Sequence, residues 1–540
     1  MKRTICVVLA LVLALSLALA GCQSNSTSSS GSSSDSQSAS GSGSESQELE
    51  PVVLEYYCMG TVAKDNDMVY EEINKYLTEK INATVNMHWL ESADYNTKMS
   101  AIIGAGQTFD MLYTARDYVN FATNAQNGAF MELDDLLTEY APDLVAAIPE
   151  YVLEGGRVNG KIYGVPSYKD VANTYAYAWN TDLAQEVGLD ESKQEAPWKY
   201  MTDLDERVRE FKAIRDEKYP ELADLPMLEV ETGMEIWWSW DNIIGGVATN
   251  VGGIDFFKDQ GSGEKVFNAY ATPEYTEILK FIRTWVDDNI FPVYQAEWDS
   301  DYALRVAGKV PVRISNGLVA APDYYFSNQK VWKCKIVRSD IAVSTTSYLQ
   351  AAMTAISQTS KNPERAMMYM NIQYTDPWYA TTSRFGIEGT HYNIVKDDAG
   401  NDRLDFTDTE NADGLETKGF YNWYGATAGN LFKCILPLDQ PDDLFDKLQQ
   451  MNEDASNYET NIGFVFDQTN VANEVAACAG VIDEYHLPLM NGAYTLDEID
   501  AKVAEFNQKL EANGIQKIID EAQKQLNEWR AAQGKTVYEG

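Results

Sequence analysis

The chain has 540 residues and a mass of 60.4 kDa, which is too long for one ordinary domain and predicts two large lobes. Its formal net charge of −40 argues against nucleic acid and anionic lipid as partners, and it favours neutral or cationic ligands. The composition is 45% hydrophobic and 11% aromatic, which is enough for sizeable cores.

Residues 1–21 are typical of an export signal. Lys2 and Arg3 precede an apolar run of about fifteen residues, which is short for a membrane-spanning helix, and small residues follow it. The run ends in LAGC, which resembles the box of bacterial lipoproteins. That resemblance implies that Cys22 becomes the first mature residue and carries a diacylglyceryl anchor. An ordinary signal peptide, with Cys22 incidental, is the alternative.

Residues 22–50 are mostly Ser with Gly, Gln and acidic residues, and they contain almost no apolar side chains. Such a segment cannot bury enough surface to fold. We expect a flexible tether with a root-mean-square reach of roughly 30 Å. A lipid at one end of this tether would hold a folded body outside the cell membrane.

Four further cysteines, Cys58, Cys334, Cys434 and Cys478, are widely spaced and form no CxxC pair. A zinc site is therefore not expected. Two disulfides or none are both compatible with this spacing.

After the tether the hydrophobic pattern alternates between strand and helix periods. Residues 51–60, 83–90 and 109–115 read as strands, and the stretches between them, DNDMVYEEINKYLTEK and DYNTKMSAIIGAG, have helical spacing. A β-α-β-α-β series predicts an α/β fold with a parallel, doubly wound sheet.

The pattern restarts at TYAYAWN, a predicted strand followed by the short helix TDLAQEVG. Later helices carry clear start signals: Thr272 with Pro273, Asn362 with Pro363, and a capping box of Thr495 and Glu498. Asn513-Gly514 is expected to end the helix that begins at that box, and IQKIIDEAQKQLNEW to form the last one.

No motif for catalysis, a cofactor or a metal is found. The three histidines, His88, His391 and His486, form no HExxH pair, and no GxSxG occurs in the folded part. Residues 155–161 fit GxxxxGK, but Ile162 replaces the hydroxyl residue and the strand-like KIYGVP follows, so no nucleotide site is expected. KDDAGND does not fit a calcium loop. The chain has 82 acidic residues, so pairs of carboxylates are too common to identify a glycosidase site or to exclude one.

GGRVNGKIYGVPSYKDVANTYAYAWNTDLAQEVGLD resembles the signature region of family 1 of the extracellular solute-binding proteins, the lipoprotein receptors of carbohydrate ABC importers. KNPERAMMYMNIQY with FGIEGTHY resembles a second block of that family, and NGIQKIIDEAQKQLNEW resembles the tail of its large members. With the lipoprotein box and the tether, the resemblance covers nearly the whole chain.

This resemblance implies a two-lobed, periplasmic-binding-protein-like fold with discontinuous lobes and a ligand cleft between them. We expect one lobe from residues 51–167 plus about 340–390, and the other from 168–339 plus about 391–540. Some large relatives carry a calcium loop after the helix that here reads DLDERVREFKAIRDEKYPELADLP. That loop is absent, so no structural calcium is expected.

The stretch IWWSWDN is the first candidate for ligand contact, because a sugar ring needs a flat aromatic beneath its apolar face and polar groups around its rim. Asp110 is expected to end the third strand, where open parallel sheets place ligands. Each candidate has a structural alternative, namely core packing, helix capping or ion pairing, and Glu388 is expected to be structural. The candidate ligand residues are Trp237, Trp238, Trp240, Tyr57, Asp110, Lys169, Trp298, Arg313, Arg384 and Trp423.

The sequence therefore predicts a lipid-anchored receptor on the outer face of a Gram-positive-type cytoplasmic membrane. It would be a monomer that delivers an oligosaccharide to the permease subunits of an ABC importer, without catalysis or a cofactor. A receptor for peptides or another polar solute, and a surface-anchored glycan hydrolase, are the alternatives.

Overall fold

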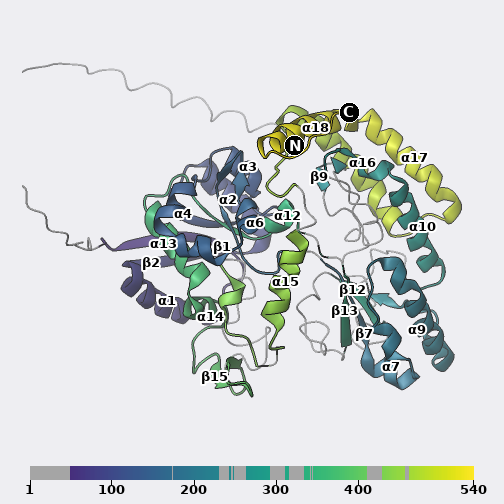
Figure 1. The fold of residues 1–540 in the computed structure, drawn as a ribbon, viewed down its shortest axis with the longest axis horizontal. Helices are drawn as coiled ribbons and strands as arrows, with labels where there is room; N and C mark the ends of the chain where they lie inside the picture. The colour runs from purple at the N-terminus through teal and green to yellow at the C-terminus, as the bar shows by residue number, and fades with distance from the viewer. Residues whose placement is uncertain are drawn as a thin grey trace, which may run out of the picture. The chain divides into compact units, whose positions relative to one another are not determined.

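The computed structural model describes residues 49–172, 174–229, 242–244, 247–248, 263–291, 310–315, 334–340, 342, 344–409, 429–438, 440–456 and 461–540 (Figure 1). All of them belong to one compact unit, Leu49–Gly540. The predicted leader and Cys22, and the tether up to residue 48, lie outside the described residues. Within the ranges described, no helix combines the length and the apolar character needed to cross a bilayer.

The first sheet has five strands in the order β2-β1-β3-β14-β6. Its strands are β1 (Val52–Met59), β2 (Ala83–Leu90), β3 (Met111–Thr114), β6 (Val165–Pro166) and β14 (Met353–Ile356). β1 pairs in parallel with β2 and β3, whereas β14 runs antiparallel to β3 and β6. The predicted β-α-β-α-β series is confirmed, and the two antiparallel pairings make the sheet mixed.

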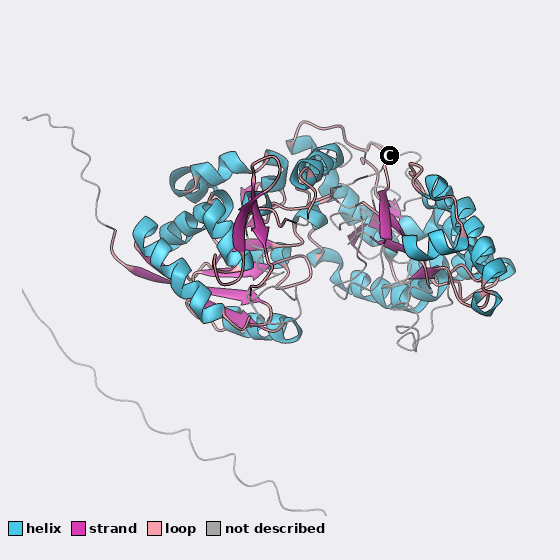
Figure 2. Ribbon diagram, turned by 90° about the horizontal axis from the view of Figure 1, so that it is seen from below, coloured by secondary structure: helices cyan, strands magenta, loops and turns pink. Residues whose placement is uncertain are grey.

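Apolar side chains cover both faces of the first sheet, as a doubly wound arrangement requires. Tyr56 packs in one core with Ile73, whereas Leu112 packs with Met99 in another core. Figure 2 shows helices on both sides of these strands. The helices that pack with the first sheet are α1 (Asn66–Ile81), α2 (Ser92–Gly104), α3 (Phe121–Gln126), α4 (Asp134–Tyr140), α5 (Pro142–Ala147), α6 (Glu150–Glu154), α12 (Thr346–Leu349), α13 (Pro363–Thr375) and α14 (Pro377–Phe385). We call this assembly the first lobe.

The second sheet has the order β13-β7-β12-β8, with β7 antiparallel to both of its neighbours. Its strands are β7 (Ala176–Asn180), β8 (Leu228–Glu229), β12 (Val312–Ser315) and β13 (Cys334–Arg338). A further three-stranded sheet contains β9 (Asn242–Ile244), β10 (Val247–Ala248) and β11 (Phe267–Asn268). The strand and helix predicted over TYAYAWN and TDLAQEVG are confirmed as β7 and α7.

One large core joins the second sheet to helices that are distant in sequence. Trp179 of β7 and Ile282 of α10 share this core with Phe506 and Leu526 from the last two helices. We call this assembly the second lobe. Its helices are α7 (Thr181–Val187), α8 (Glu191–Gln194), α9 (Asp205–Lys218), α10 (Pro273–Asp287), α16 (Ala472–Met490), α17 (Leu496–Ala512) and α18 (Ile515–Ala532).

The described residues between 377 and 456 indicate where the chain leaves the first lobe and enters the second lobe for the last time. The hairpin of β15 (Asn393–Lys396) and β16 (Asp402–Asp405) packs Leu404 against Phe385 of α14. Helix α15 (Leu444–Ser456) packs Leu448 against Phe432, whose ring also contacts the first lobe's core. These contacts favour a boundary after α15 rather than near residue 391. The division of the chain into lobes stays a prediction.

The chain passes between the two lobes at residues 168–172, 344–346 and 461–466, which we call the first, second and third crossing segments. Hydrogen bonds join these segments to one another. In the first segment, the Val171 carbonyl accepts a bond of 2.9 Å from the Ser344 hydroxyl of the second segment. The Thr346 hydroxyl accepts a bond of 3.0 Å from the Gly463 amide of the third segment. Asn452 of α15 accepts from the amides of Val171 and Ala172 and is fully buried. The crossings therefore form one bonded junction.

Most of the predicted helix signals are confirmed. The Thr272 hydroxyl accepts from the Tyr275 amide at the start of α10, and Thr495 with Glu498 forms the capping box of α17. Gly514, with φ of 93°, separates α17 from α18. Asn362 is different: its side chain makes no cap bond at α13 and donates instead to Asp110.

The four cysteines after the tether are all free thiols. Burial raises the pKa of the Cys58 thiol to about 12 and that of Cys434 to about 11. Raised thiol pKa values keep both groups protonated, and so poorly nucleophilic, at neutral pH. The sequence is compatible with two disulfides or with no disulfide, and the structure has no disulfide among these four cysteines.

We expect a folded form that begins at residue 49 to release four titratable thiols in denaturant and to react slowly with thiol reagents at pH 8 when native. Its melting temperature should not change when a phosphine reductant is added, because no disulfide is lost. A drop of several degrees with the reductant, or fewer than four thiols, would contradict this result.

Candidate functional site

Asp110 precedes β3 rather than ending it, so the predicted position was wrong. Its carboxylate accepts from the Glu55 amide at 2.9 Å and from the Ser360 hydroxyl at 2.6 Å, and Asn362 donates to the same group. The side chain is 4% exposed. Asp110 therefore joins β1, β3 and the start of α13 at the amino end of β3, opposite the edge where parallel strands place ligands.

Residues 115–120 form the loop at the carboxyl end of β3. Val119 has φ of 45°, a left-handed conformation that is unfavourable for a β-branched residue. The loop is held there because the Val119 amide donates to Asn96 of α2 at 2.6 Å and its carbonyl accepts from Thr114 at 2.9 Å. Strain of this kind is concentrated at functional sites, which makes this loop a candidate.

Polar and aromatic side chains gather on this loop and on α12, the first-lobe helix at the end of the second crossing segment. The Arg116 guanidinium lies 5.1 Å from the centre of the Tyr348 ring, donates to Ser347, and pairs with Asp117 at 2.9 Å. The Tyr118 ring is half-buried and lies 6.4 Å from that of Tyr113. We call Arg116, Asp117, Tyr118 and Tyr348 the edge cluster.

The edge cluster combines two flat rings with a guanidinium and a carboxylate. The side chains of Arg116 and Asp117 are 36% and 69% exposed, so their remaining hydrogen-bonding groups are open to solvent. A flat ring can lie under an apolar ligand face while charged groups bond hydroxyls at its rim. Nothing in this set provides a base held against a nucleophile, so the chemistry it offers is binding.

Tyr57 lies within β1, two residues before its end, and its ring is half-buried. It stacks on His88 of β2 with centroids 4.5 Å apart and meets Phe109 edge-on. Its carbonyl accepts from Tyr95, which also bonds the carbonyl of β3 residue Tyr113. These contacts support the core-packing alternative for Tyr57.

The remaining described candidates lie in three separate places. Lys169 is in the first crossing segment, where its ammonium contacts Asp170 at 3.0 Å. Arg313 is in β12, between core residues Val312 and Ile314, and is 8% exposed. Arg384 is in the last turn of α14, with its guanidinium 5.3 Å from the Phe385 ring. The structure does not bring these residues together with the edge cluster.

Glu388 lies in the turn after α14. Gly386 has φ of 91°, and a β-carbon there would lie 2.5 Å from the buried His391 ring. The Gly389 amide donates to the Tyr392 carbonyl and closes the turn. The glycines of FGIEGTHY are therefore explained by backbone geometry, and Glu388 itself is exposed.

Five predicted ligand residues lie outside the described residues: Trp237, Trp238, Trp240, Trp298 and Trp423. In chain order, the IWWSWDN stretch follows β8, which ends at Glu229, and its last residue is the first of β9. The role of these tryptophans in ligand contact stays a prediction.

The GxxxxGK match is a β-hairpin. β4 (Arg157–Val158) pairs with β5 (Lys161–Ile162), and Asn159 and Gly160 between them have φ of 50° and 83°. Positive φ at both central residues is the requirement of a two-residue hairpin turn. No helix follows the motif to face a phosphate, in line with the sequence prediction.

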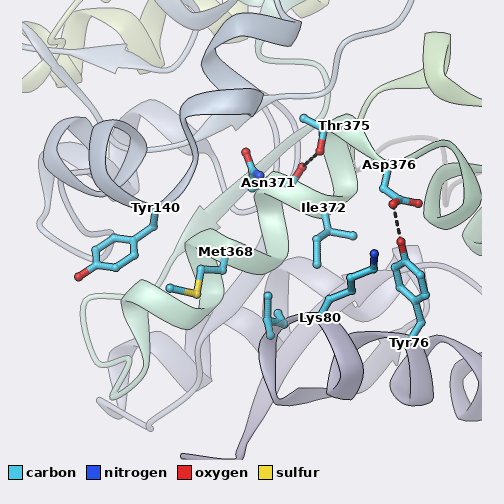
Figure 3. A pocket seen from close by; sticks show the side chains of 9 residues that line it. Tyr76, Lys80, Tyr140, Met368, Asn371, Ile372, Thr375 and Asp376 are labelled. Atoms are coloured by element: carbon cyan, nitrogen blue, oxygen red, sulfur yellow. Dashed lines mark hydrogen bonds between the residues drawn. The ribbon is translucent and has the colours of Figure 1, made fainter. Parts of the chain in front are cut away.

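A hollow of about 290 Å³ lies between α1 and α13. Figure 3 shows the side chains that line it. The Tyr76 hydroxyl donates to Asp376 at 2.5 Å, and the Thr375 hydroxyl donates to the Asn371 carbonyl at 2.6 Å. The Tyr76 ring contacts that of Trp378, with ring centroids 4.3 Å apart and the planes tilted by 32°. These polar groups bond one another, and none of the predicted ligand residues lines the hollow, so no function is assigned to it.

No group of three or more His, Cys, Asp and Glu side chains able to hold a metal ion occurs in the part of the chain that the structure describes. Two cationic side chains of α9, Lys212 and Arg215, donate hydrogen bonds to backbone carbonyls of the loop that follows this helix. Arg215 is fully buried and donates to the carbonyls of Leu225 at 2.8 Å and Pro226 at 3.1 Å. Lys212 donates to the carbonyl of Ala223 at 3.1 Å.

We expect EDTA to leave the melting temperature unchanged within about 1 °C, because Lys212 and Arg215 already donate hydrogen bonds to the carbonyls of this loop. Arg215→Met should lower it by about 3 °C or more, because the Leu225 and Pro226 carbonyls lose this donor and Asp216 keeps only Lys212. Differential scanning fluorimetry measures both. A loss of several degrees in EDTA that calcium restores would contradict the expectation.

Sequence reasoning missed the edge cluster. The signal was the polar-aromatic run ARDY directly after the buried run MLYT, at the carboxyl end of the strand. Tyr348 carried no such signal, because its contact with Arg116 joins residues more than two hundred positions apart.

Comparison with known proteins matches residues 66–378 to the family "Bacterial extracellular solute-binding protein". Residues 460–531 match a domain of unknown function, DUF3502. A carbohydrate ABC transporter substrate-binding protein of Streptococcus pneumoniae is 27% identical to this chain over 486 residues, which is 88% of this chain and 91% of that protein.

Two solved structures illustrate the likeness in fold. The N-glycan transport solute-binding protein NgtS of Streptococcus pneumoniae matches with a TM-score of 0.71 at 23% identity, over 89% of this chain and 99% of that one. The substrate-binding protein FusA of the same species, in complex with kestose, matches with a TM-score of 0.54 at 17% identity, over 89% and 100%. The predicted α/β fold class is confirmed.

Proposed function

Because the chain belongs to the bacterial extracellular solute-binding protein family, we propose that it delivers an oligosaccharide to the permease of an ABC importer. The observation that carries the proposal is the match over most of both chains to a carbohydrate ABC transporter substrate-binding protein. NgtS has been crystallised with Man1GlcNAc and with Man5GlcNAc. Oligosaccharides of mannose and N-acetylglucosamine are therefore the first ligands to test.

The family binds solutes and does not transform them, so this chain is not an enzyme. This excludes the alternative of a surface-anchored glycan hydrolase. The edge cluster supports the choice of a sugar, because it presents tyrosine rings beside donors and acceptors for hydroxyls. We propose that these residues contact the ligand from the first lobe and that tryptophans of IWWSWDN contact it as well. Ligand contact by both lobes would favour a closed arrangement.

A thermal-shift screen separates the sugar receptor from the peptide alternative. The panel contains mannose- and N-acetylglucosamine-based oligosaccharides, fructans, and peptides of matched size. We expect at least one oligosaccharide to raise the melting temperature by several degrees and no peptide to do so, because ligand binding stabilises the folded state by mass action. A shift with peptides alone would favour the alternative.

We further propose that Cys22 carries a lipid and holds the protein on the outer face of the cytoplasmic membrane, with residues 23–50 as the tether. Mass spectrometry of the mature N-terminus should find Cys22 diacylglycerylated, and Cys22→Ala should abolish that mass and retain the leader. Wild-type protein whose N-terminus lacks the lipid would contradict the anchor and leave the sugar-binding proposal to its own test.

A further inference from the structure

The matched domain of unknown function, residues 460–531, is bonded across its two ends. Arg530 lies in the last turn of α18 and is 3% exposed. Its guanidinium donates to the Asn461 side chain at 2.7 Å and to the Thr536 carbonyl at 2.5 Å. Asn461, at the start of the domain, belongs to the third crossing segment. The last helix of the chain therefore holds a residue of the junction between the lobes.

Asn461 is held from two directions. Its side chain accepts from Arg530 and donates to the Gly263 carbonyl at 3.0 Å, and both partners belong to the second lobe's side. Its own carbonyl accepts from the Thr346 hydroxyl of the second crossing at 3.4 Å, and that hydroxyl accepts from the Gly463 amide. A rotation of the lobes about this junction must strain or break one of these sets of bonds.

The side chains after Asn461 alternate between the two lobes. Ile462 packs against a core of the first lobe, and Val465 packs against the other core of that lobe. Phe464 and Phe466 pack against the core of the second lobe, and the Phe464 ring lies 5.8 Å from that of Trp529, the neighbour of Arg530. Residues 461–466 are therefore the part of the chain that both lobes share.

We propose that Arg530 is a positioning residue for ligand binding. It fixes residues 461–466 and thereby sets how freely the lobes open and close, which assigns a role to the matched domain of unknown function. The inference rests on the proposed receptor function, because lobe motion matters only if the ligand favours one arrangement. A contact that favours the binding-competent arrangement raises the apparent ligand affinity, at most by the factor by which it shifts the equilibrium between arrangements.

The first test needs no ligand. Hydrogen exchange is measured on residues 49–540 and on its Arg530→Met and Arg530→Lys variants, with peptides that cover 461–466 and 168–172. We expect roughly tenfold faster exchange in the crossing segments of Arg530→Met, because opening there becomes easier. Lysine keeps one donor for Asn461, so Arg530→Lys should restore part of the protection. Unchanged exchange in Arg530→Met overturns the proposal.

Arg403→Met is the matched control. Arg403 of β16 is 4% exposed, about as buried as Arg530, and it pairs with Asp397 at 2.9 Å in the β15–β16 hairpin and with Asp442, two residues before α15. It should lower the melting temperature and leave exchange at the crossings unchanged. Thr346→Val removes the hydroxyl on the other side of Asn461 and should act in the same direction as Arg530→Met. It replaces that variant if Arg530→Met does not fold.

The second test measures affinity for the oligosaccharide that gives the largest thermal shift. We expect a roughly five- to tenfold weaker Kd for Arg530→Met, partial recovery for Arg530→Lys, and an unchanged Kd for Arg403→Met. An unchanged Kd in Arg530→Met, or equal losses in Arg530→Met and Arg403→Met, overturns the proposal. If the wild type binds no oligosaccharide, the proposed function fails, and the exchange experiment still decides whether Arg530 holds the junction.

Discussion

Replacing Gly156 with alanine is expected to lower the melting temperature by about 2–4 °C, the largest loss foreseen for one added methyl group. A β-carbon at Gly156 would lie 2.0 Å from the Gly164 carbonyl oxygen. That contact cannot relax, because the Gly156 carbonyl accepts from the Tyr163 amide at 2.9 Å, so the two backbones are tied together. The site is the hairpin that joins α6 to β6 of the first sheet.

Gly104→Ala is the matched control for this prediction. Gly104 is the last residue of α2, and a β-carbon there would meet no atom within 4 Å. Alanine favours the helix over glycine, so the melting temperature should stay the same or rise slightly. Scanning calorimetry compares the three proteins. Equal melting temperatures for wild type and Gly156→Ala would show that the close approach of the two backbones is wrong.

Replacing Tyr118 with alanine is expected to weaken oligosaccharide binding about ten- to a hundredfold, the range in which a central aromatic contact falls. The ring is half-buried at the carboxyl end of β3, on a loop whose strained Val119 is held by Asn96 and Thr114. That anchoring fixes the ring before the ligand arrives, so little entropy is lost on binding. Calorimetric titration with the oligosaccharide chosen by thermal shift measures the Kd.

Trp378→Ala controls for the loss of an aromatic ring elsewhere on the first lobe. Trp378 is 38% exposed and contacts the Tyr76 ring at the hollow between α1 and α13, to which no function is assigned. Its removal should leave the Kd within about twofold of the wild type. If Tyr118→Ala binds as tightly as Trp378→Ala, the edge cluster is not part of the ligand site.

The parts of the fold that follow from local patterns could be predicted from the sequence. The period of two over ATVNMHWL and of 3.6 over α1 identifies those elements, because burial of one face depends on spacing alone. The cap of Thr272 and the capping box of Thr495 act within four residues of the chain. Both partners of such an interaction lie close together in the chain, so the interaction can be predicted from one sequence.

The candidate site depends on contacts that no local pattern encodes. Asp110 and Arg116 flank the same buried strand, and only the strand's exact start, at Met111, tells which of them lies at the carboxyl end. Tyr348 reaches the edge cluster through the antiparallel pairing of β14 with β3. The bond between Arg530 and Asn461 likewise joins the ends of a unit of three helices. Long-range pairings of this kind are visible only once the chain is folded.

Isothermal titration of the folded protein with oligosaccharides of mannose and N-acetylglucosamine tests the central claim most directly, provided the ligand is recovered and analysed afterwards. We expect saturable binding by at least one oligosaccharide, with the recovered ligand chemically unchanged. No heat from any oligosaccharide with demonstrably folded protein, or recovery of shortened glycans, would contradict the account of this chain as a sugar receptor.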